Sequence, residues 1–229
     1  MTNTVFKNCN GLDEDGHVTT AYDIALMSRA LIQHEKIFDY TQVWMDELRG
    51  GKTQLVNTNK LLKSYSGITG LKTGTTGKAG SCMAATAERD GMSLVAVVLG
   101  CASTEDRFSS AASLLDAGFS GWALTAPSLS SDALAPIAVE KGMQSTVAVE
   151  ADPLTGVVVP KGREGEVVCE TTMEETLTAP VEQGQAVGEV TCVLDGEVLA
   201  RSQIRAASSV EALTFSSAWL SLLRAVVSF

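Results

Sequence analysis

The chain has 229 residues, and 45% of them are apolar, which is enough for one or two domains with packed cores. The formal net charge is −10, and most of it falls in residues 127–229. An acidic chain without a basic patch repels phosphate backbones, so nucleic-acid binding is excluded and the acidity is expected to serve solubility. No run of about 18 apolar residues predicts a membrane-spanning helix. Residues 1–10 do not have the pattern of a secretory signal peptide.

The first predicted helix covers residues 21–34. Thr20 and Asp23 have the spacing of an N-terminal capping box, and the apolar residues that follow fall on or near one face. A looser region with a turn at Gly50-Gly51 comes next, and residues 70–74 are expected to be extended.

Two strand-like runs, residues 81–88 and 93–100, flank Asp90-Gly91, which is a strong signal for a tight hairpin. The second run is apolar from residue 94 to residue 99, as in a strand that is buried on both faces.

A helix over residues 104–118 is predicted after the hairpin, with Ser103 as its N-cap. Helix, strand, hairpin and helix together predict an α+β domain over residues 1–125, in which helices cover an antiparallel sheet.

Composition changes near residue 127, and residues 128–132 have the character of a linker. Short valine-rich runs separated by glycine predict a small all-β sandwich domain over residues 126–207, with a second hairpin at Asp195-Gly196. The expected strands are residues 146–149, 156–159, 166–170, 186–194 and 197–204.

The last segment, residues 208–229, is predicted to be an amphipathic helix with many leucine, valine and aromatic residues. We favour a helix that lies in a membrane surface, and a helix packed on the body of the protein is the alternative.

The five cysteines do not have C-x-x-C spacing, so a zinc knuckle or a thioredoxin-type site is not expected. Cys169 and Cys192 could pair, but the odd number argues against a full disulfide framework, and we expect buried free thiols. His17 and His34 lack ligand partners in the sequence and are expected at the surface. We therefore expect neither a metal site nor a cofactor.

Gly77-Lys78 superficially resembles a phosphate-binding loop. Such a loop needs a glycine where Lys72 stands, and a serine or threonine where Ala79 stands. A phosphate-binding function is therefore the weakest hypothesis.

Lys72-Thr73-Gly74, at the start of the predicted hairpin, is the informative motif. An edge strand can pair with an extended peptide through backbone hydrogen bonds, and glycine lets the peptide approach closely. A lysine cation and a threonine hydroxyl can hold a carboxylate, and the N–H just after the motif can polarise a carbonyl group. Serine acyl-transfer enzymes that recognise penicillin combine Lys-Thr-Gly with Ser-x-x-Lys and Ser-x-Asn motifs.

Several runs around this motif share the pattern of one known family. They are Phe6-x-Asn8-x-Asn10-Gly11-Leu12, Gly16-His17-x-Thr19-Thr20-Ala21-Tyr22-Asp23, Asn59-Lys60-Leu61-Leu62, Gly70-Leu71-Lys72-Thr73-Gly74 and Ala179-Pro180-Val181-x-x-Gly184-Gln185. Through them nearly the whole chain resembles the serine D-Ala-D-Ala carboxypeptidases of the peptidase S11 type, which are low-molecular-mass penicillin-binding proteins.

This resemblance implies a partial β-lactamase- and transpeptidase-like domain, a C-terminal β-domain and an amphipathic membrane anchor. It also implies that Lys72, Thr73 and Gly74 recognise the substrate and its terminal carboxylate. The backbone N–H of Thr75 would form one half of an oxyanion hole.

The resemblance further implies that Arg107 adds positive potential behind the carboxylate site; a helix-surface position is the alternative. Thr58 stands where the family often has a basic residue, and this departure bears on the affinity for a carboxylate.

Neither Ser-x-x-Lys nor Ser-x-Asn occurs in the 229 residues. Without the serine no acyl-enzyme forms, so we expect an inactive C-terminal portion of a carboxypeptidase that trims the terminal D-alanine from peptidoglycan stem peptides. A truncated gene product and a split pair with a separate N-terminal polypeptide are both open. The rival hypothesis is a non-catalytic scaffold at a membrane or cell wall.

By resemblance, the intact relative also binds β-lactams covalently and works at the outer face of the cytoplasmic membrane. Because the chain shows no export signal of its own, a cytoplasmic location is an equal alternative.

Overall fold

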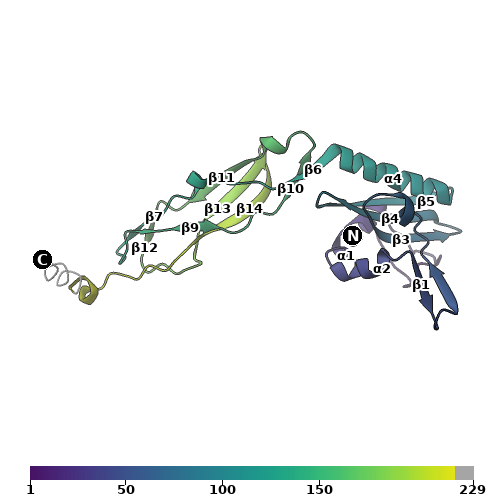
Figure 1. Cartoon of the computed structure of the whole chain (residues 1–229), viewed down its shortest axis with the longest axis horizontal. Coiled ribbons are helices and arrows are strands. Elements are labelled where there is room, and N and C mark those ends of the chain that lie inside the picture. Colours follow the sequence, from purple (N-terminus) through teal and green to yellow (C-terminus); the bar gives the residue numbers. More distant parts are fainter. Residues whose placement is uncertain (220–229) are drawn as a thin grey trace. The chain divides into compact units, whose positions relative to one another are not determined.

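The computed structural model describes residues 1–219, which divide into two compact units, one from Met1 to Ala123 and one from Leu124 onward. Helices and strands are mixed in the first unit, and strands dominate the second (Figure 1). The predicted α+β class is confirmed.

The first unit contains short helices, a hairpin and a three-stranded sheet. Its elements are α1 (Ala21–Leu31), η1 (Glu35–Ile37), α2 (Phe38–Thr41), β1 (Met45–Leu48), β2 (Thr53–Val56), α3 (Leu61–Ser64), β3 (Ile68–Thr76), β4 (Gly80–Arg89), β5 (Met92–Cys101) and α4 (Thr104–Gly121).

The sheet of the first unit has the strand order β3-β4-β5, and both pairs are antiparallel. Its core lies between the sheet and α4, where Ala85 and Ala87 of β4 cluster with Phe108, Ala111 and Leu115. In Figure 1, α4 runs along one face of the sheet and α1 lies on the other.

Local sequence chemistry places the helix starts and the hairpin turn as predicted. The Thr20 side chain accepts from Asp23 N, and the Ser103 side chain accepts from Asp106 N. Asp90 has φ 51° and Gly91 has φ 76°, the left-handed pair of a tight hairpin turn.

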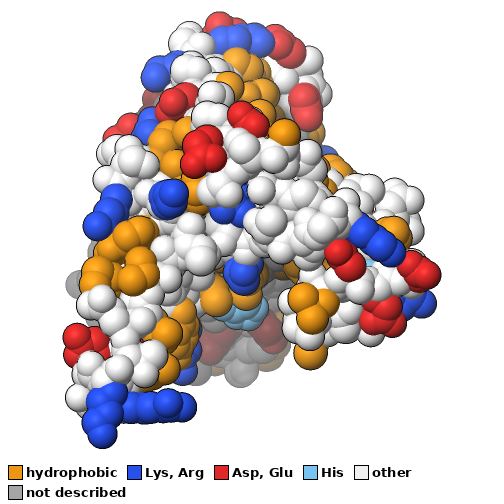
Figure 2. Space-filling view, turned by 90° about the vertical axis from the view of Figure 1, so that its right-hand side faces the viewer, with side chains coloured by type: hydrophobic (Ala, Val, Ile, Leu, Met, Phe, Trp, Pro, Cys, Tyr) orange, Lys and Arg blue, Asp and Glu red, His pale blue; other side chains and the backbone are white. Residues whose placement is uncertain are grey.

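Two predictions for this unit are wrong. The looser region contains the β1–β2 hairpin, whose apolar side chains at Met45, Leu48, Leu55 and Val56 are exposed. The apolar run of β5 is not buried on both faces, because Leu99 remains 39% exposed. Several groups of apolar side chains are visible on the face drawn in Figure 2.

The second unit contains mostly short strands. Its elements, beginning at the unit boundary, are β6 (Trp122–Thr125), η2 (Ser131–Ala133), β7 (Ile137–Glu140), β8 (Thr146–Val147), β9 (Val149–Ala151), β10 (Val157–Pro160), η3 (Glu164–Glu166), β11 (Val168–Met173), β12 (Thr176–Thr178), β13 (Ala186–Leu194) and β14 (Glu197–Ala206).

Two sheets of the second unit, β11-β13-β14-β9 and β12-β7-β8, share one hydrophobic core. Val139 and Leu177 from the smaller sheet cluster with Val190 and Ile204 from the larger one, as in a sandwich. The sequence prediction missed β6, β7 and β12, and β12 pairs with β7 in parallel. The Asp195-Gly196 turn has φ 51° and 81°, again the left-handed pair.

The predicted helix over residues 208–229 is wrong for its first part. Val210 is 1% exposed, bridges Val181 and belongs to the sandwich core. Helical structure is described from residue 215 to 219, and the rest of the predicted helix lies outside the described residues. Within residues 1–219, no helix is long and apolar enough to cross a membrane.

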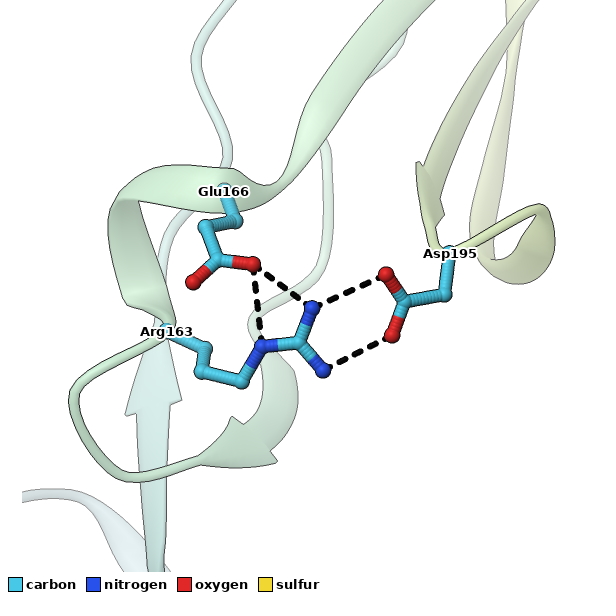
Figure 3. Close-up of polar contacts among 3 residues, drawn as sticks. All are labelled: Arg163, Glu166 and Asp195. Atoms are coloured by element: carbon cyan, nitrogen blue, oxygen red, sulfur yellow. Dashed lines mark hydrogen bonds and ion pairs between the residues drawn. The ribbon is translucent and has the colours of Figure 1, made fainter.

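Arg163 connects the loop before β11 with the β13–β14 turn (Figure 3). Its guanidinium donates to Asp195 Oδ1 and Oδ2 at 2.9 and 2.7 Å, and to Glu166 Oε2 at 2.6 and 2.9 Å. The hydrogen bonds from Arg163 lower the pKa of Asp195. Because the folded pKa is the lower one, this contribution to stability is present at neutral pH and is lost as the pH falls through the folded pKa.

Cys169 and Cys192 form a disulfide, so the expectation of free thiols is wrong for this pair. The two residues lie directly opposite each other on β11 and β13. Their separation of 23 residues in sequence is closed by strand pairing, which the cysteine count alone did not reveal. Cys9, Cys82 and Cys101 are free.

We expect the Cys169→Ala/Cys192→Ala variant to lower the free energy of unfolding of the second unit by about 3 kcal/mol. The reason is that the unfolded chain gains conformational entropy when a loop of this length is no longer closed. Urea unfolding followed by tryptophan fluorescence and circular dichroism measures it. Cys9→Ser is the control, since Cys9 is exposed and free. An unchanged urea midpoint in the double variant would contradict the expectation.

Candidate functional site

The candidate site lies along β3, which pairs with β4 on one side and has no strand on its other side within residues 1–219. Lys72 is exposed, whereas Thr73 is 6% exposed. A Cβ built at Gly74 would meet no atom within 4 Å, so the space beside this glycine is open. An edge strand of this kind leaves alternate N–H and C=O groups free for an extended peptide.

Thr58 and Asn59, just after the β1–β2 hairpin, fasten that segment to β3. The hydroxyl oxygens of Thr58 and Thr73 are 2.5 Å apart and share a hydrogen bond. Asn59 is 1% exposed, donates from Nδ2 to Gly70 O at 3.2 Å and accepts from Leu61 N at 3.1 Å. A neutral hydroxyl, that of Thr58, therefore stands next to Thr73.

Arg107 reaches β3 from α4. It is 5% exposed, so the structure differs from the alternative of a helix-surface residue. Its Nη1 donates to Gly74 O and Thr75 Oγ1, each at 3.1 Å, and to Cys82 O at 3.4 Å. The guanidinium also lies over the ring of Phe108, with 4.7 Å from Cζ to the ring centroid.

Within the part of the chain that the structure describes, the charge of Arg107 has no carboxylate partner. None of the ion pairs within residues 1–219 involves it, and its Nε is buried without a hydrogen-bond acceptor. A buried cation normally needs an anion or full hydrogen bonding. The end of β3 therefore carries positive potential that an anionic ligand can compensate.

The structure thus gathers Thr73, Gly74, Thr75 and Arg107 at one end of β3, with the Lys72 ammonium in contact with Thr73 O. Within the described residues, no group of three or more metal-binding side chains exists.

Sequence reasoning missed Asp13, which belongs to the loop before α1. Its Oδ2 accepts from Lys78 N at 3.1 Å, in the turn that follows β3. Hydrogen bonds from the Thr76 side chain and the Lys78 backbone lower the pKa of Asp13. The separation of 65 residues between Asp13 and Lys78 explains why no local pattern predicts this contact.

Comparison with known families gives matches for both units of the chain. Residues 1–103 match the family model of D-alanyl-D-alanine carboxypeptidase, and residues 129–212 match that of the penicillin-binding protein 5 C-terminal domain. The chain belongs to the D-alanyl-D-alanine carboxypeptidase family. The predicted resemblance is confirmed.

Individual relatives of this carboxypeptidase family cover most of the chain. The chain is 35% identical over 219 residues to D-alanyl-D-alanine carboxypeptidase DacF of Bacillus subtilis. This alignment covers 94% of the chain and 56% of DacF. The chain is 33% identical to DacC of Escherichia coli, over 92% of this chain and 53% of DacC. The crystal structure of penicillin-binding protein 5 from Haemophilus influenzae matches with a TM-score of 0.69 and 25% identity, over 91% of this chain and 61% of that one.

The chain spans about half the length of the curated family members it matches. The absence of Ser-x-x-Lys and Ser-x-Asn from the 229 residues fits this partial coverage.

Because Arg107 has no carboxylate partner among the described residues, we expect Arg107→Met to change the free energy of unfolding by less than about 1 kcal/mol. Removal of one member of a buried ion pair costs about 3–5 kcal/mol. Phe108→Ala is the control for loss of core packing and should cost about 3–5 kcal/mol. Urea unfolding of the wild type, Arg107→Met and Phe108→Ala measures these free energies. A loss of stability above about 3 kcal/mol for Arg107→Met would show that the charge is structurally paired.

Proposed function

We propose that the chain supplies the substrate-binding strand of a D-alanyl-D-alanine carboxypeptidase. The ligand is the C-terminal D-Ala-D-Ala of a peptidoglycan stem peptide, bound in extended form along the free edge of β3. The buried, unpaired charge of Arg107 beneath Gly74 and Thr75 carries this proposal. The names of the relatives support the reaction class.

In this proposal each group at the end of β3 has a separate task. The positive charges of Lys72 and Arg107 attract the terminal carboxylate, and the Thr73 hydroxyl binds it. The N–H of Thr75 stabilises the oxyanion that develops on the scissile carbonyl. A serine hydroxyl attacks that carbonyl, the bond to the terminal D-alanine breaks, and water hydrolyses the resulting ester. That serine must come from a segment outside these 229 residues.

Two features of the first unit support the proposal that a further polypeptide segment covers its sheet. The outer edge of β5 is unpaired within residues 1–219. Between β5 and α1 lies an open pocket of about 310 Å³, lined in part by Leu26, Ile32 and Val95. Met27 and Leu31 add exposed apolar side chains on another face of α1. A segment that carries Ser-x-x-Lys, in the same or a separate polypeptide, would cover the edge and the pocket.

The same site suits β-lactams, which present a carboxylate and a reactive carbonyl in a similar arrangement. We therefore include penicillin binding by the assembled site in the proposal, in keeping with the name of the family model for residues 129–212. The Cys169–Cys192 disulfide supports a location outside the cytoplasm, because disulfides persist in oxidising compartments.

We expect the 229-residue chain alone not to become covalently labelled by fluorescent penicillin, since it lacks the nucleophile. It should still bind D-Ala-D-Ala weakly, with amide shift changes at Lys72 to Thr75 in NMR spectra and none in Arg107→Met. The dipeptide amide, which lacks the terminal carboxylate, is the matched ligand control.

Covalent label on the isolated chain would contradict the missing nucleophile. Equal shifts with the dipeptide and its amide would contradict the carboxylate site. If a polypeptide with Ser-x-x-Lys is co-expressed, the split-pair hypothesis predicts that the two co-purify and that labelling appears on the added serine.

A second candidate function is attachment to a membrane surface. Phe215 and Trp219 are 87% and 57% exposed and follow Thr214, whose side chain accepts from Ser217 N as a helix cap does. Exposed aromatic side chains on a short helix can insert into the headgroup region of a bilayer. This candidate is compatible with a purely scaffolding role as well as with the carboxypeptidase.

We expect Phe215→Ser/Trp219→Ser to reduce co-flotation of the chain with liposomes by about tenfold, because two aromatic anchors are lost. The matched control is Val168→Ser/Val198→Ser, which removes two other exposed apolar side chains of the second unit. Equal flotation of the wild type and both double variants would exclude these aromatic residues as the anchor. Truncation should begin after residue 213, because Val210 belongs to the core.

A further inference from the structure

The loop of residues 8–17 carries a carboxylate to the turn that ends β3. Asp13 Oδ2 accepts a hydrogen bond from Lys78 N at 3.1 Å. The Thr76 side chain and the Lys78 backbone are the two largest causes of the lowered pKa of Asp13. The Thr76 hydroxyl oxygen in turn accepts from Ala79 N at 3.0 Å. The carboxylate of Asp13 and the hydroxyl of Thr76 thus each bind a backbone N–H of the β3–β4 turn.

The loop that presents Asp13 is itself internally hydrogen-bonded. Asn8 Oδ1 accepts from Gly11 N and Leu12 N at 2.9 and 3.2 Å, and Asn8 Nδ2 donates to Leu12 O at 3.0 Å. A backbone bridge between Val5 and Val18 closes its base. Since the acceptor belongs to an ordered loop, it can restrain the turn it contacts.

Thr75 lies between two restraints. Arg107 binds its hydroxyl from α4, and Asp13 holds the turn that begins with the next residue, Thr76, which pairs with Gly80 as the last pair of the β3–β4 ladder. The direction of the Thr75 N–H depends on the backbone at both ends of this residue. An oxyanion donor is effective only if it is held in place before the charge develops.

We propose that Asp13 is a positioning residue for the reaction, which fixes the β3–β4 turn and thereby the direction of the Thr75 N–H. The inference rests on the proposed function for the oxyanion role of Thr75, and the restraint itself can be measured without catalysis. Hydrogen bonds to an ionised acceptor are stronger than neutral ones, so a carboxylate suits this task.

Asp15 provides a matched control in the same loop. Its carboxylate pairs with Lys78 Nζ at 2.9 Å, and both side chains are largely exposed, so this ion pair touches the same turn without binding its backbone. Exposed ion pairs of this kind contribute little. Asp13→Ala, Asp13→Asn and Asp15→Asn therefore separate backbone restraint from surface charge.

The experiment compares ¹⁵N-labelled wild-type chain with the three variants by NMR and amide hydrogen exchange. In Asp13→Ala, we expect the Lys78 amide to exchange at least about tenfold faster and the Thr75 amide resonance to shift. Asp13→Asn, which keeps one acceptor oxygen, should restore part of both effects. Asp15→Asn should match the wild type, and unchanged resonances of the α4 core in all variants would show that the fold is intact.

If the Lys78 amide loses protection while the Thr75 resonance does not move, Asp13 only caps the turn and the proposal is wrong. It is also wrong if Asp15→Asn has the same effect as Asp13→Ala. D-Ala-D-Ala titration of the wild type is read separately: a lack of shifts at Thr75 counts against the proposed function and leaves the restraint by Asp13 standing. Weaker dipeptide-induced shifts at Thr75 in Asp13→Ala, with recovery in Asp13→Asn, would support both.

Discussion

One positive charge is buried in the first unit without a carboxylate partner among the described residues. Arg107 lies between α4 and the sheet, and its guanidinium donates to carbonyl groups of both β3 and β4. The depth of this charge is set by the helix start, because Ser103 caps α4 and its carbonyl accepts from Arg107 N. Phe108, next in sequence, anchors the same turn of α4 in the core. Core packing and helix capping thus hold a cation against the strand that carries the motif.

A structural role alone does not account for this arrangement. Burial of a guanidinium costs free energy that shared hydrogen bonds to carbonyl groups recover only in part, and the Nε proton is left without an acceptor. Buried charges with incomplete hydrogen bonding occur mainly at sites that bind or transform ligands. The open space at Gly74 lies beside the same strand, so the cost and the room for a ligand coincide.

How much the sequence predicted depended on whether the interaction was local. Thr20, Ser103, Asp90-Gly91 and Asp195-Gly196 act within a few residues, and the structure has the caps and turns that their chemistry demands. The Cys169–Cys192 disulfide and the Asp13 contact join distant segments, and no spacing rule predicts them. The β1–β2 hairpin was missed because its strands are short and lack alternation of buried and exposed residues. Val210 was assigned to the terminal helix because its pairing with Val181 is also non-local.

The sheet of the first unit has two free edges within residues 1–219, and their side chains differ. Unprotected edges invite aggregation, so each needs a partner or a reason to remain open. β5 presents an apolar run beside an apolar pocket, which suits permanent cover by another segment of polypeptide. β3 presents a lysine, two threonine hydroxyls and a glycine, with a buried cation beneath them, which suits a small, charged and exchangeable ligand. The contrast between the edges therefore supports the proposal that β3 is open for a ligand, and it makes β5 the edge that suits a covering segment.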